Sequence, residues 1–303
     1  MSEFPLEGTF TALVTPMKGD AQRSVDMEAL ERLVEQQIAG GVDGLVPCGT
    51  TGEAATLTFD EWRQVVSTVV RVAAGRVPVV AGTGSNNTAA TIATTQAAKE
   101  LGVDAALVVV PYYNKPTQAG LIAHFEAVLS SVSIPVVLYN VPGRTVTNLN
   151  AETTAHLASH GQVVAIKEAS GNLDQVQRII ELTEGRFAVL SGDDGLCVPM
   201  YSVGGRGVVS VVSNCAPTQT AALYKDYRAG RIAEAARGQI ALRSLIEALF
   251  CEANPQPIKA AMAALGLMEP HVRLPLLTAS KEATARVTSE LARLGLDGLR
   301  APC

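Results

Sequence analysis

Lys167 is the residue whose position most directly suggests chemistry, because it follows an unbroken apolar run, VVAI, where a buried strand is expected to end. Lysine is rarely fully buried. Val163, Ala165 and Lys167 share one parity, and a barrel strand directs alternate side chains inward. Removal from water disfavours a charged amine, and a neutral amine attacks carbonyl carbon. An outward Lys167 paired with a helix carboxylate is the alternative, and this stretch alone leaves both open.

Further polar residues follow the other apolar runs. Tyr139 shares the inward parity of Val137, so its phenol can carry protons, although buried tyrosines are more often core rings with a bonded hydroxyl. Thr50 and Thr51 lie on a glycine-flanked stretch that can offer hydroxyls and amide N–H groups to a carboxylate, or that is only a turn. Arg144 offers a guanidinium fork to a substrate carboxylate, or lies on the surface. Their joint occurrence at the ends of apolar runs favours a site.

The elements that would position these residues repeat along the chain. Short apolar runs alternate with stretches of helical periodicity, as in a parallel sheet covered by helices. We expect eight strands, at residues 11–16, 44–49, 77–84, 105–113, 134–142, 163–170, 187–194 and 207–214. Asp26 is expected to be the N-cap of one helix, and Thr58 and Glu61 are expected to form a capping box at the start of another. This repetition predicts an α/β fold, a (β/α)₈ TIM barrel, with its active site at the carboxyl ends of the strands.

The last part of the chain reads as helical. No strand pattern returns after Asn214, and helices are expected at residues 217–250, 256–266 and 279–295, separated by proline-marked breaks. We therefore expect a barrel with the catalytic site at residues 1–230 and a C-terminal helical region, an appendage to the barrel, at residues 231–303.

Composition narrows the class of partner. The chain is 48% hydrophobic with a net charge of -5 and no block of Lys or Arg, which argues against nucleic acid or an anionic membrane as the main partner and favours small molecules. No basic leader and no segment of membrane-spanning length is evident, so we expect a cytoplasmic protein. Five scattered cysteines without a CxxC pair fit a reducing compartment and no zinc site.

Three other motifs fit structural roles better. GTGSNN at residues 82–87 lacks the third glycine and the downstream acid of a phosphate loop, and we interpret it as a tight turn. His156 and His160 lie four residues apart on an expected outer helix without a third ligand, so we interpret them as surface residues and predict no metal. Capping of the next helix explains Asp193 and Asp194 more readily than a divalent cation does.

Five motifs taken together resemble the dihydrodipicolinate synthase family, pyruvate-dependent Schiff-base lyases that also include N-acetylneuraminate lyase. They are GTTGE at residues 49–53, PYYNKP at 111–116, YNVPGRT at 139–145, IKEASGN at 166–172 and SGDD at 191–194. The match keeps the order and spacing of the motifs and continues beyond NPQPIK at residues 254–259, so it covers nearly the whole chain.

The resemblance implies a role for each matching residue. Lys167 would form an imine with pyruvate, and Tyr139 would shuttle protons. Thr50 would link Tyr139 to Tyr113, which in this family reaches across a subunit boundary, so a homo-oligomer is implied, a tetramer built as a dimer of dimers. The amides of Thr50 and Thr51 would hold the pyruvate carboxylate.

The resemblance also implies the second substrate. Arg144 would bind the carboxylate of an aldehyde, and the retained guanidinium favours L-aspartate-4-semialdehyde. Gly192 and Val209, the latter commonly isoleucine in the family, would line the pocket through backbone groups. The implied reaction is an aldol-type condensation followed by cyclisation to 4-hydroxy-tetrahydrodipicolinate, the first committed step of lysine (diaminopimelate) biosynthesis. It requires no metal or organic cofactor.

One departure bears on regulation. Lysine-inhibited members of the family use a glutamate at an interface site where this chain has Ala90, and histidines where it has Phe59 and Trp62. Tyr112 and Asn86 match the family. Because the carboxylate partner for the ammonium group of lysine is absent, we expect weak or no inhibition by lysine.

Two rival functions stay open. One is another pyruvate-dependent aldolase on the same scaffold, acting on 4-hydroxy-2-oxoglutarate or a sugar acid, which Arg144 does not exclude because short dicarboxylates also need an arginine. A non-catalytic pyruvate-binding barrel is the second rival. The intact set of Lys167, Tyr139, Thr50 and Tyr113 argues against it.

Overall fold

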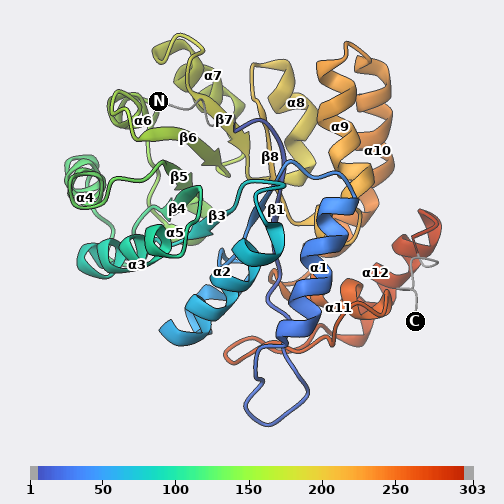
Figure 1. Ribbon diagram of the computed structural model, residues 1–303. Helices are drawn as coiled ribbons and strands as arrows, with labels where there is room; N and C mark the ends of the chain where they lie inside the picture. Colours follow the sequence, from blue (N-terminus) through green and yellow to red (C-terminus); the bar gives the residue numbers. More distant parts are fainter. Residues whose placement is uncertain (1–5, 297–303) are drawn as a thin grey trace.

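In the computed structural model, which describes residues 6–296, eight parallel strands form a barrel that helices surround (Figure 1). The strands are β1 (Gly8–Ala12), β2 (Gly44–Val46), β3 (Val80–Gly82), β4 (Ala105–Val109), β5 (Val136–Asn140), β6 (Val163–Glu168), β7 (Ala188–Ser191) and β8 (Gly207–Ser210). They pair in the order β2-β1-β8-β7-β6-β5-β4-β3. Backbone bonds from Leu45 N to Pro78 O and from Gly82 N to Pro47 O, both 2.9 Å, join β2 to β3. The predicted (β/α)₈ barrel is confirmed.

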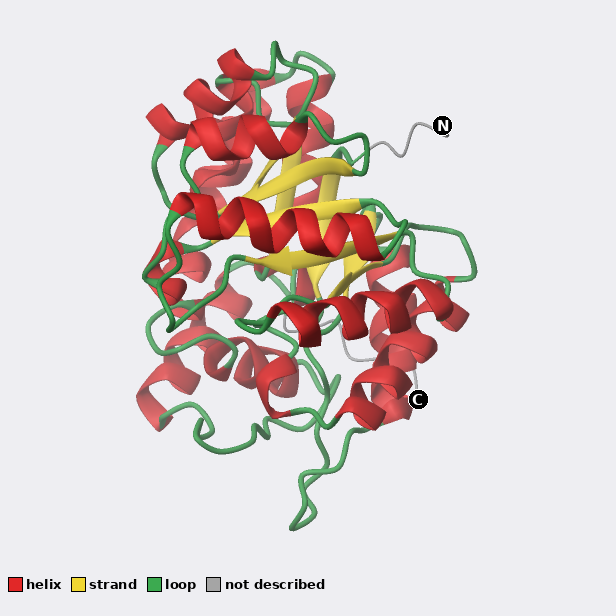
Figure 2. Ribbon diagram, turned by 90° about the vertical axis from the view of Figure 1, so that its left-hand side faces the viewer, coloured by secondary structure: helices red, strands yellow, loops and turns green. Residues whose placement is uncertain are grey.

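Helices cover the outside of the barrel, as Figure 2 shows, with the strands at the centre. Those of the barrel are α1 (Met27–Ala39), α2 (Phe59–Ala73), α3 (Thr88–Glu100), α4 (Gln118–Ser131), α6 (Ala151–Ala158), α7 (Leu173–Leu182), α8 (Cys197–Ser202) and α9 (Pro217–Arg228), with the short α5 (Pro142–Thr145) in a loop. The C-terminal region contains α10 (Ile232–Leu249), α11 (Gln256–Ala264) and α12 (Lys281–Arg293). None of the helices within residues 6–296 has the length and apolarity needed to cross a membrane.

Side chains at the helix starts explain where several helices begin. The Asp26 carboxylate accepts a hydrogen bond from Ala29 N at 3.1 Å, which satisfies one of the free amides at the start of α1. Thr58 Oγ1 accepts from Glu61 N at 3.2 Å while the Glu61 carboxylate accepts from Thr58 N at 2.9 Å. The predicted N-cap and capping box are therefore both confirmed.

Two apolar layers lie on opposite sides of the strands. The inner layer fills the barrel with alternate residues, among them Phe10, Val46, Val80, Leu107, Val137, Tyr139, Ala165, Leu190 and Val209. The outer layer joins the other face of each strand to the helices, with residues such as Leu45, Val108, Leu138 and Ile166. Both faces of every strand are thus buried, which is why the strands read as continuous apolar runs.

The observed strands are shorter than the expected runs, as for β4, which ends at Val109 and not at residue 113, and two further differences are larger. β1 begins at Gly8 and ends at Ala12, because its pairing with β8 begins at Gly8 opposite Gly207, so residues 13–16 lie beyond the strand. The helix expected at residues 217–250 is two helices, α9 and α10, separated at Gly230, which has a left-handed φ of 77°. The expected boundary between residues 230 and 231 falls in this turn, and a functional division there stays a prediction.

Candidate active site

Lys167 and Tyr139 meet at the carboxyl ends of two neighbouring strands. They are register partners on β6 and β5, and the Lys167 ammonium nitrogen lies 4.3 Å from the centroid of the Tyr139 ring, within cation–π distance. The two residues are only 7% and 6% exposed. Lys167 also has the parity of Ala165, which belongs to the inner apolar layer. The inward orientation is confirmed, and the outward alternative for Lys167 is wrong.

Gly192 makes room for the lysine. Its amide, one residue beyond β7, donates to Glu168 O at 2.7 Å, which fixes its backbone beside the end of β6. A Cβ atom on Gly192 would lie 2.6 Å from Ala169 Cβ and 3.1 Å from Lys167 Cε. Carbon atoms pack at about 3.5–4.0 Å, so only glycine leaves this space to the lysine stem. Val209 is buried on β8 in the same inner layer.

The turn at residues 49–53 offers two adjacent amides. It is closed by hydrogen bonds of 3.1 Å from Gly52 N to Gly49 O and from Glu53 N to Thr50 O. The amide groups of Thr50 and Thr51 donate to no acceptor within residues 6–296. Adjacent free amides of this kind bind anions. The Thr50 side chain is exposed, whereas Thr51 is buried.

Tyr113 and Arg144 lie outside this compact group. Tyr113 is 88% exposed and has a left-handed φ of 74°, an unusual conformation for a bulky residue. In the described part of the single chain, no hydrogen bond joins the hydroxyl groups of Thr50, Tyr139 and Tyr113. Arg144 is exposed on α5 and forms no ion pair with a described residue. Neither side chain forms a hydrogen bond or ion pair with another residue in the described range 6–296.

Glu168 organises the loop that carries Arg144, a connection that the sequence analysis did not find. Its carboxylate is buried and accepts hydrogen bonds of 3.0 Å from Asn140 Nδ2 and from Gln175 Nε2. Asn140 in turn accepts from Leu149 N at 2.9 Å. The loop after β5 is therefore tied to the end of β6, next to Lys167. The only sequence signal was that Glu168 directly follows Lys167.

Asp193 and Asp194 have different roles. Asp193 accepts a hydrogen bond from Gly195 N at 2.8 Å, so it caps the next turn as expected. Asp194 does not cap it, since its buried carboxylate accepts instead from Ser210 and, at 2.9 Å, from Val211 N. Burial raises the pKa of Asp194. The capping interpretation is thus wrong for Asp194, which ties the end of β7 to that of β8.

A buried lysine packed on a tyrosine ring at the carboxyl ends of β6 and β5 places a potential nucleophile at the mouth of a (β/α)₈ barrel, where enzymes of this fold have their active sites. Comparison with known proteins identifies one family. The chain belongs to the dihydrodipicolinate synthetase family, which it matches over residues 5–294.

Individual relatives match this chain along almost their whole length. The chain is 50% identical over 295 residues to a 4-hydroxy-tetrahydrodipicolinate synthase of Sorangium cellulosum, covering 97% of this chain and 98% of the relative. Among solved structures, a dihydrodipicolinate synthase of Thermotoga maritima superposes with a TM-score of 0.93 at 41% identity, covering 96% and 99% of the two chains. A chloride-inhibited dihydrodipicolinate synthase of Acinetobacter baumannii complexed with pyruvate gives a TM-score of 0.94 at 40% identity, covering 96% and 100%.

Proposed function

We propose that this protein condenses pyruvate with L-aspartate-4-semialdehyde to give 4-hydroxy-tetrahydrodipicolinate, the first committed step of lysine biosynthesis by the diaminopimelate route. Relatives at 46–50% identity bear the name of this activity. The observation that carries the proposal is the buried Lys167 amine beside the Tyr139 ring, in space that Gly192 leaves open. A single reactive amine at the mouth of an apolar barrel is suited to imine formation.

The chemistry begins at Lys167. Its neutral amine adds to the carbonyl carbon of pyruvate, and loss of water gives an imine. The protonated imine withdraws electrons, so a methyl proton of pyruvate can be removed to give an enamine. The enamine carbon attacks the aldehyde carbon, and the new alkoxide takes up a proton. The amino group of the second substrate then displaces Lys167 from the imine, which closes the ring and restores the free lysine.

Tyr139 is the proposed proton carrier, because its ring lies against the reacting amine. Thr50 would extend this route to Tyr113 of a second subunit. The exposure of Tyr113 and its strained backbone support a function outside its own chain. We therefore propose a homo-oligomer, a tetramer arranged as a dimer of dimers, in which each site is completed by its neighbour. Cytoplasmic localisation stays a prediction from the sequence.

The carboxylates of the two substrates would be bound by different loops, the one after β2 and the one after β5. The free amides of Thr50 and Thr51 suit the pyruvate carboxylate. Arg144, which has no partner among the described residues, suits the carboxylate of the aldehyde. Gly192 and Val209 would line the pocket between them.

Reductive trapping tests the proposal. Borohydride in the presence of pyruvate should give one adduct per chain, on Lys167, as found by peptide mass mapping. Lys167→Ala should give no adduct and no turnover, whereas Lys115→Ala, which alters the lysine two residues beyond Tyr113, should retain the adduct. An adduct on another lysine, or normal turnover in Lys167→Ala, contradicts the mechanism. Preferred turnover of 4-hydroxy-2-oxoglutarate over the proposed pair of substrates contradicts the assignment of the aldehyde.

A further inference from the structure

Glu53 ends the turn that carries the two free amides, and its backbone is strained. Its φ of 54° lies in the left-handed region, which a residue with a side chain rarely adopts unless other contacts hold it there. Its own side chain supplies such contacts. The residue is 4% exposed, so the carboxylate is directed into the protein and away from water.

The partner of Glu53 is a lysine from the C-terminal helices. Lys259 on α11 is 0% exposed, and its ammonium group forms an ion pair with the Glu53 carboxylate. The same ammonium donates to His271 O at 2.8 Å. The second carboxylate oxygen of Glu53 accepts from Arg273 N at 3.0 Å. Burial lowers the pKa of Lys259, and the negative charge of Glu53 opposes this effect. Each charge therefore depends on the other for compensation.

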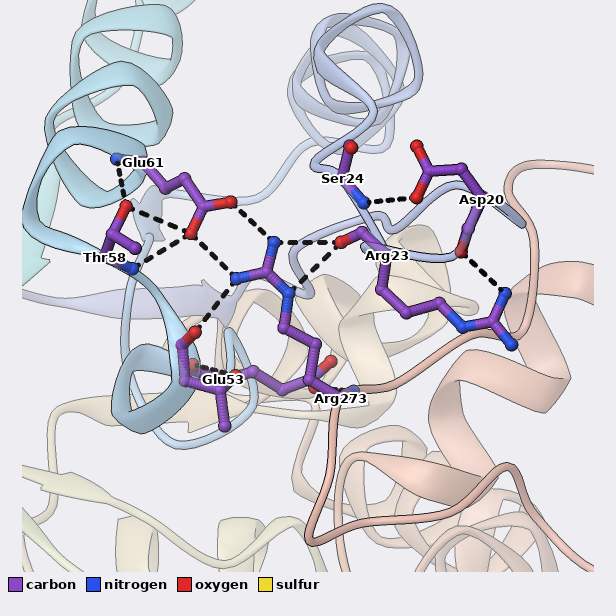
Figure 3. A network of polar contacts seen from close by, with 8 residues as sticks. Asp20, Arg23, Ser24, Glu53, Thr58, Glu61 and Arg273 are labelled. Atoms are coloured by element: carbon purple, nitrogen blue, oxygen red, sulfur yellow. Dashed lines mark hydrogen bonds and ion pairs between the residues drawn. The ribbon is translucent and has the colours of Figure 1, made fainter.

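Two further contacts connect the same regions. Asn254 Nδ2, just before α11, donates to Thr51 Oγ1 at 2.9 Å. The Arg273 guanidinium binds the Glu61 carboxylate and donates to Thr56 O at 2.9 Å, so the segment that carries Arg273 is fixed to the start of α2 (Figure 3). Figure 3 also shows Glu53 in this network. The C-terminal segment thus holds the turn at both Thr51 and Glu53.

We propose that Glu53, Lys259 and Asn254 are positioning residues for pyruvate, because they hold the turn at residues 49–53 in the one conformation that leaves the amides of Thr50 and Thr51 free for the substrate carboxylate. This inference rests on the proposed function, in which those amides bind pyruvate. It makes the C-terminal helices part of the substrate site, although none of the three residues touches the reacting atoms.

Binding of pyruvate should weaken when the pair is altered, while later steps are spared. Glu53→Gln keeps the shape of the side chain and removes its charge. Either single change, Glu53→Gln or Lys259→Met, leaves the other residue as an unpaired buried charge and can prevent folding, so the double variant Glu53→Gln/Lys259→Met removes both charges together. Val287→Ala, a fully buried position on α12 of the same helical region, is the control for loss of stability alone.

The measurement is kcat/KM for each substrate, together with Tm. We expect kcat/KM for pyruvate to fall about tenfold in Glu53→Gln and in the double variant, since misdirected amides lose part of a charge-assisted hydrogen bond. The value for the aldehyde should change by less than about twofold. Asn254→Ala should show the same pattern to a smaller extent. Val287→Ala should retain the value for pyruvate even at an equally lowered Tm.

Unchanged kcat/KM for pyruvate in folded Glu53→Gln and double variants overturns the inference, as does an equal loss in Val287→Ala or an equal loss for both substrates. Failure of the proposed function looks different. If the unaltered protein forms no borohydride adduct with pyruvate, the imine mechanism fails. If the unaltered protein forms the adduct and the variants keep its kcat/KM for pyruvate, the proposed function stands and only the positioning role fails.

Discussion

Replacement of Gly192 by alanine should damage imine formation more than it damages the fold. The added Cβ would lie 2.6 Å from Ala169 Cβ and 3.1 Å from Lys167 Cε, against about 3.5–4.0 Å for a normal carbon contact. The overlap is about 1 Å or more with Ala169 Cβ and about half an ångström or more with Lys167 Cε. Ala169 has no flexible side chain, and the hydrogen bond from Gly192 N to Glu168 O, 2.7 Å long, resists movement of the Gly192 backbone, so we expect the end of β6 and the lysine stem to shift together, which displaces the Lys167 amine.

The expected magnitudes differ for the two readouts. Overpacking of this kind costs about 1–3 kcal/mol of stability, which lowers the Tm of a chain of this size by a few degrees. A reacting group displaced by about 1 Å can lose on the order of 100-fold in rate. We therefore expect the rate of borohydride-trapped adduct formation on Lys167 to fall about 100-fold in Gly192→Ala, with a folded protein.

A matched glycine provides the control. At Gly143, one residue before Arg144, an added Cβ would have no atom within 4 Å, and φ is not positive. Gly143→Ala should therefore leave both the trapping rate and Tm nearly unchanged. If Gly192→Ala traps pyruvate within about twofold of the unaltered rate, Gly192 does not set the position of the amine. The steric argument is then refuted.

Two more predictions concern regulation and pH. Lysine at micromolar concentration should not inhibit the enzyme in a steady-state assay. The rings of Phe59 and Trp62 stack with their centroids 5.8 Å apart, and an alanine, Ala90, replaces the carboxylate that would bind the ammonium group of lysine. A micromolar half-inhibition constant would show this prediction to be wrong. The Arg273 hydrogen bonds lower the pKa of Glu61 to about 2 from 4.5. The ion pair of Glu61 with Arg273 therefore stabilises the folded protein fully above pH 4.5, the ordinary pKa of a glutamate, and this stabilisation is lost as pH falls towards 2. Because Glu61 is partly exposed, solvent screening limits the stabilisation to about 1 kcal/mol. The Tm difference between the unaltered protein and Glu61→Gln should narrow by more than half between about pH 5 and pH 3, and a constant difference contradicts this account.

The barrel and the centre of the site could be predicted because their signals are local. Continuous apolar runs show strands buried on both faces, and parity along a run gives the direction of Lys167 and Tyr139. Caps such as Asp26 act within a single helical turn. The start of β1 was placed too late, since it depends on pairing with Gly207, almost at the other end of the barrel sequence.

Contacts between distant segments were beyond the reach of the sequence. Glu168 was visible as the neighbour of Lys167, yet nothing in its surroundings indicated that Gln175 and Asn140 would converge on it. Asp194 was interpreted as a cap because capping is what a local pattern can show, while its actual partners, Ser210 and Val211, lie at the end of β8 and directly after it. Each of these groups is polar and buried, so each needs partners, but identifying the partners requires the fold.

The pairing of Glu53 with Lys259 changes how the C-terminal helices should be understood. A barrel that ended near residue 230 would leave the Glu53 carboxylate without its lysine and without Arg273 N, and it would also lack the segment that packs on this carboxylate. The carboxylate would lose the contacts that hold the left-handed backbone of Glu53 in place, and we expect it to turn towards solvent. The amides of Thr50 and Thr51 belong to the same turn and would move with it. The helices after residue 231 are therefore expected to determine the geometry of the anion site, in which case both parts of the chain would contribute to one function.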